Sequence, residues 1–171
     1  MKQKLVFLLL VLCFATTEEA FSQMAKFKAL FLYNFTQNVE WPPSASNPNE
    51  FVITVIGDKE MATELEKLAQ VKKVGTKTIV IKQENQVKNL EDSQVIFLSA
   101  GKSSLMSMLS SDQDGKPTLL ISSKEGLCSD GAAISFTTVD GKLRYEICST
   151  NIEKHGLKVN NKLLSLGIPV N

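Results

Sequence analysis

The pattern of hydrophobic and polar positions predicts strands and helices that alternate along the chain. Short runs rich in β-branched residues predict strands at 51–56, 78–81, 94–98 and 118–121. Helices are expected between them, one capped by Asp58 and a short one beginning at Ser103 and ending at Leu109. Strands that alternate with helices usually pair in parallel through right-handed crossovers. We therefore expect an α/β fold, a compact three-layer sandwich whose mostly parallel sheet is covered on both faces.

Residues 24–39 contain neither proline nor glycine and predict an N-terminal aromatic helix. Its apolar residues at helical spacing are Phe27, Leu30, Phe31 and Phe35. Leu32 and Tyr33 widen the apolar arc beyond the stripe of an ordinary surface helix. Either the whole helix lies in the core with Trp41 packed over its end, or its second side, through Leu32 or Tyr33, contacts a partner. The candidate partner-binding residues are Phe31, Tyr33 and Trp41.

The C-terminal part of the chain predicts a β-hairpin. Strand-like runs at 132–138 and 142–148 flank Asp140-Gly141, a pair typical of two-residue turns in which both residues have positive φ. Helical turns are expected after the hairpin, at 152–155 and 159–166. The hairpin breaks the alternation of strands and helices and adds an antiparallel pair to the sheet.

Two cysteines, Cys128 and Cys148, lie in the part of the chain that is expected to fold. A two-residue turn would place Ala133 opposite Cys148, and Cys128 precedes this point by a few residues. The loop that carries Cys128 can therefore fold back onto the open end of the hairpin and allow a disulfide. The alternative is two separate buried thiols.

The first 22 residues have the pattern of a secretory signal peptide. Lys2 and Lys4 precede an apolar run at 5–15, and small residues at −3 and −1 predict cleavage after Ser22. Cys13 as a lipoprotein anchor is the less favoured alternative, because leucine precedes it where a small residue is expected. The run is too short for a membrane span of about 20 residues. We expect an exported protein, located in the periplasm, with a single domain at 23–171.

Charge gives no argument for nucleic-acid binding. The chain has 19 lysine and arginine residues and 18 acidic residues, a net charge of +1. Arg144 alone is able to make bidentate contacts to phosphates or guanine edges. A DNA or RNA partner is therefore not expected.

Residues with catalytic or metal-binding chemistry form no recognisable motif. Gly101-Lys102-Ser103-Ser104 resembles the end of a phosphate-binding loop, but Ile96 stands where that motif needs glycine. The simpler interpretation, without a bound phosphate, is a tight turn in which Ser103 caps a helix. His155 is the sole histidine, and a zinc site on Cys128, Cys148 and His155 lacks the usual ligand spacing and competes with the disulfide. We expect no enzyme, no metal and no cofactor, which leaves binding as the default role.

A second class of function is the binding of a small molecule at the carboxyl ends of the parallel strands. Open α/β sheets usually place their ligands there. The loops that follow the strands carry donors and positive charge for an anion or a nucleotide-like ligand, and the candidate residues are Asp58, Lys102 and Ser103. Such a protein would deliver its ligand signal to a sensor kinase.

Three motifs, in order, resemble the YfiR family of small periplasmic proteins from Lys26 to the C-terminus. An aromatic helix ends in Trp41-Pro42, a strand ends in Gly57, and a hairpin strand at 141–147 is followed by a segment that contains Leu163-Leu164. The resemblance implies a compact α/β fold without a catalytic site. It also implies a regulator that binds the periplasmic sensing part of an inner-membrane diguanylate cyclase, an enzyme of cyclic-di-GMP signalling, and holds it inactive.

The same resemblance implies that an outer-membrane lipoprotein relieves the inhibition and that oxidation of the cysteines affects stability and activity. This chain has Ser93 where many relatives carry cysteine, so a redox response would rest on Cys128 and Cys148 alone. Asn160-Asn161 replaces a serine-containing stretch. With these departures a histidine kinase could replace the cyclase as the partner, and a homodimer is compatible with the pattern.

Overall fold

The computed structural model describes residues 23–43, 47 and 49–171. The predicted signal peptide, its cleavage site and Cys13 lie outside the described residues. Part of the polar loop that follows Pro43 also lies outside them.

Eight strands form the main sheet, in the order β10-β8-β7-β6-β5-β2-β4-β3. They are β2 (Glu50–Ile56), β3 (Lys73–Val74), β4 (Lys77–Glu84), β5 (Val95–Leu98), β6 (Leu119–Ser122), β7 (Ile134–Val139), β8 (Lys142–Ile147) and β10 (Ile168–Pro169). A separate antiparallel pair joins β1 (Val39–Glu40) to β9 (Lys158–Val159). The four predicted strands and the hairpin are confirmed, whereas the two-residue strands are additions.

The five central strands, in the order β4-β2-β5-β6-β7, are all parallel to one another. Strands β3 and β8 are antiparallel to the strands beside them, and β10 runs parallel to β8. The central order is that of a flavodoxin-like doubly wound sheet, in which the direction of winding changes between the first and third strands. Here that switch point lies between β2 and β5. The predicted α/β fold with a mostly parallel sheet is confirmed.

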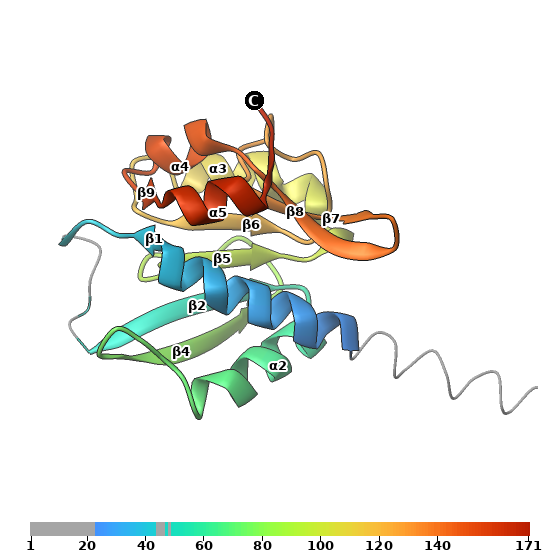
Figure 1. The fold of residues 1–171 in the computed structure, drawn as a ribbon. Coiled ribbons are helices and arrows are strands. Elements are labelled where there is room, and N and C mark those ends of the chain that lie inside the picture. The colour runs from blue at the N-terminus through green and yellow to red at the C-terminus, as the bar shows by residue number, and fades with distance from the viewer. Residues whose placement is uncertain (1–22, 44–46, 48) are drawn as a thin grey trace, which may run out of the picture.

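Helices cover both faces of the sheet, as predicted for a three-layer sandwich. They are the N-terminal helix (23–38), α2 (Lys59–Ala69), the 3₁₀ helix η2 (Ala100–Leu105), α3 (Met106–Asp112), α4 (Ser149–Lys154) and α5 (Asn161–Leu166). Figure 1 shows the N-terminal helix crossing one face of the sheet between α2 and α5, with α3 on the opposite side. The N-terminal helix is therefore a central part of its layer.

Side-chain alternation along the strands produces two separate cores. Ile53 and Phe97 point toward the layer of the N-terminal helix, while Ile56, Ile96 and Leu120 point toward α3. Because both faces of these strands are buried, their sequence is a nearly continuous apolar run without polar alternation.

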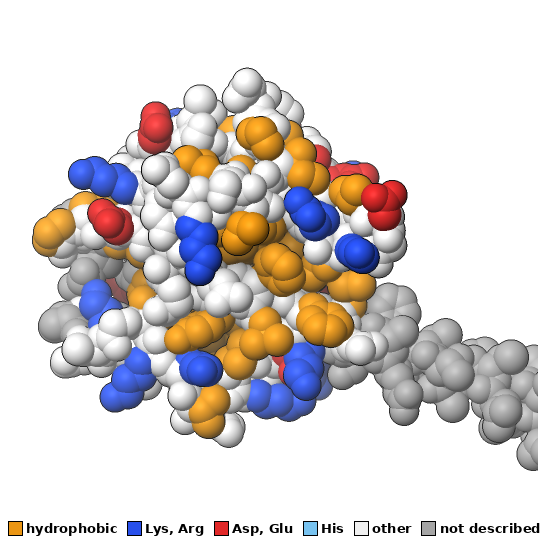
Figure 2. Space-filling view, viewed as in Figure 1, with side chains coloured by type: hydrophobic (Ala, Val, Ile, Leu, Met, Phe, Trp, Pro, Cys, Tyr) orange, Lys and Arg blue, Asp and Glu red, His pale blue; other side chains and the backbone are white. Residues whose placement is uncertain are grey.

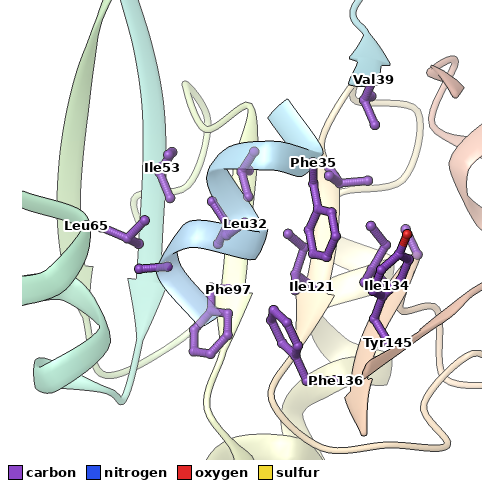
Figure 3. Packing of buried hydrophobic residues seen from close by; sticks show 14 of the residues in the cluster. Leu32, Phe35, Val39, Ile53, Leu65, Phe97, Ile121, Ile134, Phe136 and Tyr145 are labelled. Carbon is purple, nitrogen blue, oxygen red and sulfur yellow. The ribbon is translucent and has the colours of Figure 1, made fainter. Parts of the chain in front are cut away.

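Aromatic side chains attach the N-terminal helix to the hairpin. The ring of Phe35 lies 4.8 Å from that of Tyr145 and 5.8 Å from that of Phe136, measured between centroids. Leu32 lies beside it and is fully buried, and both point from the helix toward the sheet in Figure 3. The Tyr145 hydroxyl donates a hydrogen bond to the carbonyl of Leu163, 2.8 Å away. The first helix, the hairpin and the last helix thus share one core.

The hairpin has the predicted turn. Asp140 has φ 50° and Gly141 has φ 71°, which is the left-handed region that a two-residue turn of this kind requires. The register is also confirmed, because the N–H of Cys148 donates to the carbonyl of Ala133 at 2.9 Å.

Cys128 and Cys148 form the predicted disulfide, with their Cα atoms 5.8 Å apart. The side-chain amide of Asn151 donates to the carbonyls of Cys128 and Ala132, which holds the loop of Cys128 against the end of the hairpin. His155 is buried, and its Nδ1 lies 2.9 Å from the carbonyl oxygen of Lys116. The bonded cysteines exclude the zinc site that was considered as an alternative.

One local prediction is wrong. Ser103 does not cap a helix, because the chain turns directly from β5 into η2 and Ser99 occupies the position before it. Ser103 lies inside the 3₁₀ helix, and α3 begins only at Met106. The short α-helix expected from Ser103 to Leu109 therefore begins three residues later than predicted, after the 3₁₀ helix.

Replacement of Phe35 by alanine should lower the free energy of unfolding by about 3–5 kcal/mol, because it leaves a cavity between the helix and the hairpin. Urea denaturation of Phe35→Ala and the parent protein measures this loss. The exposed Phe27 provides the matched control, and Phe27→Ala should cost no more than about 1 kcal/mol. An equal loss for the two variants would contradict the buried position of Phe35.

Reduction of the disulfide should lower the free energy of unfolding by about 3 kcal/mol, because the bond closes a loop with a sequence separation of 20 residues. Urea denaturation with and without a reducing agent tests this value. Intact-mass analysis after alkylation under oxidising, denaturing conditions is the control. Two alkylated thiols in that experiment would show that the bond does not form.

Candidate functional site

The N-terminal helix has an exposed row of apolar side chains, Met24, Phe27 and Leu30, which we call the exposed ridge. They are spaced three residues apart, and their side chains are 40%, 46% and 37% exposed, respectively. The opposite side of the helix is buried, with Ala29 and Leu32 against the sheet. The helix is therefore apolar on two sides, one of which has no cover from the described residues.

Further apolar and basic side chains surround the exposed ridge. Figure 2 shows hydrophobic side chains gathered over the N-terminal helix and toward α5, with lysine and arginine side chains around them. Leu166 of α5 and Val139 at the end of the hairpin are also exposed. A large apolar area with a polar rim is typical of surfaces that contact another macromolecule.

A groove of about 360 Å³ runs between the N-terminal helix and α2. Leu30 and Leu68 supply apolar surface in this groove, and Lys26 and Lys67 supply positive charge. Glu64 lies 2.6 Å from Lys67 and offsets part of this charge. The groove is suited to an apolar side chain that is accompanied by an acidic group.

Two of the predicted partner-binding residues are packed against the core. Phe31 is half-buried, and its ring meets those of Phe136 and Tyr145 edge-on at 6.2 and 6.0 Å. Trp41 is also half-buried, packs edge-on against Phe51 at 5.0 Å, and donates from its indole nitrogen to the carbonyl of Gln94. Trp41 thus packs beyond the end of the helix. This matches the first alternative, in which the helix lies in the core and Trp41 covers its end.

Tyr33, the third predicted residue, lies beside the turn that follows α2. Its hydroxyl donates to the carbonyl of Lys73 at 3.3 Å, and the Lys72 ammonium lies 5.9 Å from the ring centroid. Because the side chain is only half-buried, part of the ring reaches the surface. Phe31, Tyr33 and Trp41 therefore do not form one exposed group, and their role in partner binding stays a prediction.

Leu32 was expected to be a possible contact for a partner, and this expectation is wrong because Leu32 is fully buried. The buried side of the helix includes Ala25, Ala29 and Thr36, small residues that allow close approach to the sheet. A search for large apolar residues alone finds Phe35 on this side but groups it with Phe27 and Leu30, which are exposed. The spacing of the two alanines was the signal that could have corrected the assignment.

The predicted small-molecule site lies at the carboxyl ends of the parallel strands, where the structure has a cleft of about 640 Å³. Asp58 lines the cleft and also caps α2, because its Oδ1 accepts from the N–H of Met61 at 2.9 Å. A Cβ placed on Gly57 would lie 2.7 Å from Lys102 Cγ, so the stem of Lys102 packs over this backbone. Of the three predicted residues only Asp58 lines the cleft, and neither Lys102 nor Ser103 is part of the lining.

Lys28 also lines the cleft, although the sequence did not identify it as a candidate. Its Nζ donates to Ser123 Oγ at 2.6 Å and lies 5.6 Å from the centroid of Phe136. Burial lowers the pKa of the Lys28 ammonium below its ordinary value, and the nearby charge of Asp58 raises it in part. The docking of the N-terminal helix over the strand ends creates this arrangement, which no local pattern encodes.

The fold is that of a small α/β protein, and these two surfaces are its candidate binding sites. The sequence matches the model of the YfiR/HmsC-like family over residues 25–168, so the chain belongs to this family. No curated protein matches the sequence. Among residues 23–43, 47 and 49–171, no helix has the length and apolar character needed to cross a bilayer.

The lowered pKa of Lys28 predicts a pH dependence of stability. The unfolded chain holds this proton up to about its ordinary pKa of 10.5, whereas the folded protein releases it at lower pH. Between the two values the unfolded state binds more protons, so the parent protein should gain stability as pH rises through this window. The Lys28→Met variant should lack this gain, as measured by thermal unfolding at a series of alkaline pH values.

The control is Lys26→Met, which removes the same charge from an exposed position of the same helix and should keep the pH dependence of the parent protein. Burial also raises the pKa of Tyr145, but this residue is present in all three proteins and its effect cancels in the comparison. Identical pH profiles for Lys28→Met and the parent protein would contradict the burial of the ammonium.

Proposed function

We propose that the protein is an exported regulator that binds the periplasmic sensor region of an inner-membrane signalling protein, of the diguanylate cyclase type, and holds it inactive. The observation that carries this proposal is membership of the YfiR/HmsC-like family over residues 25–168, which is nearly the whole described domain. A role in binding needs no catalytic residue, so the proposal includes no enzymatic step and no cofactor.

Two observations support a location in the periplasm. Residues 1–22 have the pattern of a signal peptide, and the folded domain contains a disulfide between Cys128 and Cys148. Disulfides persist in oxidising compartments such as the periplasm and are rare in the cytosol. The bond also supports a sensitivity of the regulator to the redox state of its surroundings.

The exposed ridge is the surface that we assign to the membrane partner. Phe27 supplies an exposed aromatic ring, and aromatic anchors often dominate the energy of protein interfaces. The groove beside it carries Lys26 and Lys67, so the partner should present apolar side chains flanked by acidic groups. A histidine kinase with a periplasmic sensor is the alternative partner, and an outer-membrane lipoprotein that releases the regulator would complete the system.

The test is a crosslinking pull-down from membranes of the source organism, with the chain from Gln23 onward as bait. Mass spectrometry should identify an inner-membrane protein that has a periplasmic sensor region and a cytoplasmic cyclase or kinase domain. The double variant Phe27→Ser/Leu30→Ser should lower recovery about tenfold or more, because it removes two apolar contacts from the interface. In cells, the same variant should fail to lower cyclic-di-GMP if the partner is a cyclase.

Met108→Ser is the matched control, because Met108 is 52% exposed on α3, on the opposite face of the sheet. It should retain recovery of the partner, and circular dichroism should show that all variants are folded. If the Phe27→Ser/Leu30→Ser variant recovers as much partner as the parent protein, the interface lies elsewhere. The predicted residues Phe31, Tyr33 and Trp41 would then be the next positions to change. Recovery of no membrane protein with a folded bait would refute the proposed function.

A further inference from the structure

The cleft at the carboxyl ends of the strands lies at the switch point of the sheet. Ser99 follows β5 and donates from its N–H to the carbonyl of Ile56 at the end of β2. Ser123 follows β6 and donates in the same way to Leu98 at the end of β5. These bonds align three strand ends beneath the start of the N-terminal helix, in the position where open parallel sheets bind ligands.

Ser99 contains an unsatisfied buried hydroxyl in this cleft. The residue is only 6% exposed, and its Oγ has no hydrogen-bond partner among the described residues. A Cβ placed on Gly57 would lie 2.8 Å from this oxygen, so the hydroxyl lies close to the backbone of Gly57, which lines the same cleft. A buried hydroxyl without a partner destabilises the fold, and alanine would avoid that cost. A ligand that accepts a hydrogen bond would give the hydroxyl its missing partner.

Lys28 provides a positive charge in the same cleft. Its ammonium has lost part of its hydration and donates to the neutral hydroxyl of Ser123 at 2.6 Å. The nearby charge of Asp58 compensates this cation only in part, and a bound anion would compensate it further. Lys28 and Ser123 therefore form a donor pair that an anionic group can bridge.

The surrounding residues limit the charge and size of the ligand. Asp58 and Glu60 line the cleft and repel anions, and because this repulsion grows with the charge of the ligand they favour a monoanion over a dianion. Met24, Ala25 and Ala100 add apolar surface, and the volume of about 640 Å³ leaves room for a short hydrocarbon group. We propose that this cleft binds a small organic monocarboxylate, with the carboxylate held by Lys28, Ser123 and Ser99.

The flexible side chain of Lys102 packs over Gly57, on the same side of its backbone as the hydroxyl of Ser99. A Cβ placed on Gly57 would lie 2.7 Å from Lys102 Cγ and 2.8 Å from Ser99 Oγ. Rotation of this unbranched side chain opens the hydroxyl to the ligand without movement of the backbone. The residues that hold the carboxylate are separate from the surface assigned to the membrane partner, because neither Lys28 nor Ser99 belongs to the exposed ridge. Met24 borders both the ridge and the cleft.

The test is a titration of the ¹⁵N-labelled chain from Gln23 onward with butyrate, followed by two-dimensional NMR. Saturable shifts are expected at the amides of 57–60, 99–102 and 123–124. Butanol tests the need for charge and inorganic phosphate tests the preference for a monoanion, and both should bind more weakly than butyrate. Shifts that are absent, unsaturable or remote from these segments would overturn the proposal, as would equal binding of butanol or phosphate.

Three variants separate ligand binding from a structural role. Lys28→Met should raise the dissociation constant about tenfold or more, and Lys26→Met, outside the cleft, should leave it unchanged. Ser99→Ala should weaken butyrate binding while it preserves or raises the melting temperature, because it removes an unpaired buried hydroxyl. Parent-like affinity in Lys28→Met or Ser99→Ala, or an equal loss in Lys26→Met, would overturn the assignment of these residues.

Discussion

The packing of the N-terminal helix against the sheet is the contact on which the rest of the structure depends. Phe35 inserts between Phe136 and Tyr145 of the hairpin, and Leu32 joins the same core as the residues of the central strands. Removal of this helix would expose the apolar side chains in the middle of one face of the sheet to water, between α2 and α5. The helix therefore joins the parallel part of the sheet to the hairpin.

Both functional surfaces arise from the way in which this helix is docked. Its small residues, such as Ala29, sit close to the sheet, which turns Phe27 outward and brings Lys28 over the strand ends. Neighbouring residues of one rigid helix thus belong to two different surfaces. A protein bound at the ridge and a small molecule bound in the cleft would contact the same element from different sides.

Sequence reasoning succeeded where local chemistry determines the structure. The apolar runs predicted the central strands, and Asp140-Gly141 predicted the turn and the register that bring Cys148 within reach of Cys128. It failed where close tertiary contact decides, as for the buried side of the N-terminal helix. The two-residue strands are too short for any alternation to be read. Asp58 was found because it follows a strand, whereas Lys28 reaches the cleft only through the docking of a distant helix.

The small sheet of β1 and β9 joins the beginning of the domain to its end. Val39 pairs with Val159, and the side chains of Asn38 and Asn160 bond across a sequence separation of 122 residues. A chain that emerges from its N-terminus onward cannot close this pair until almost its whole length is available. Folds that rely on contacts between distant residues form slowly. The aromatic first helix is thus made long before the pair that closes its C-terminal end can form, and its apolar side chains are open to aggregation in the interval.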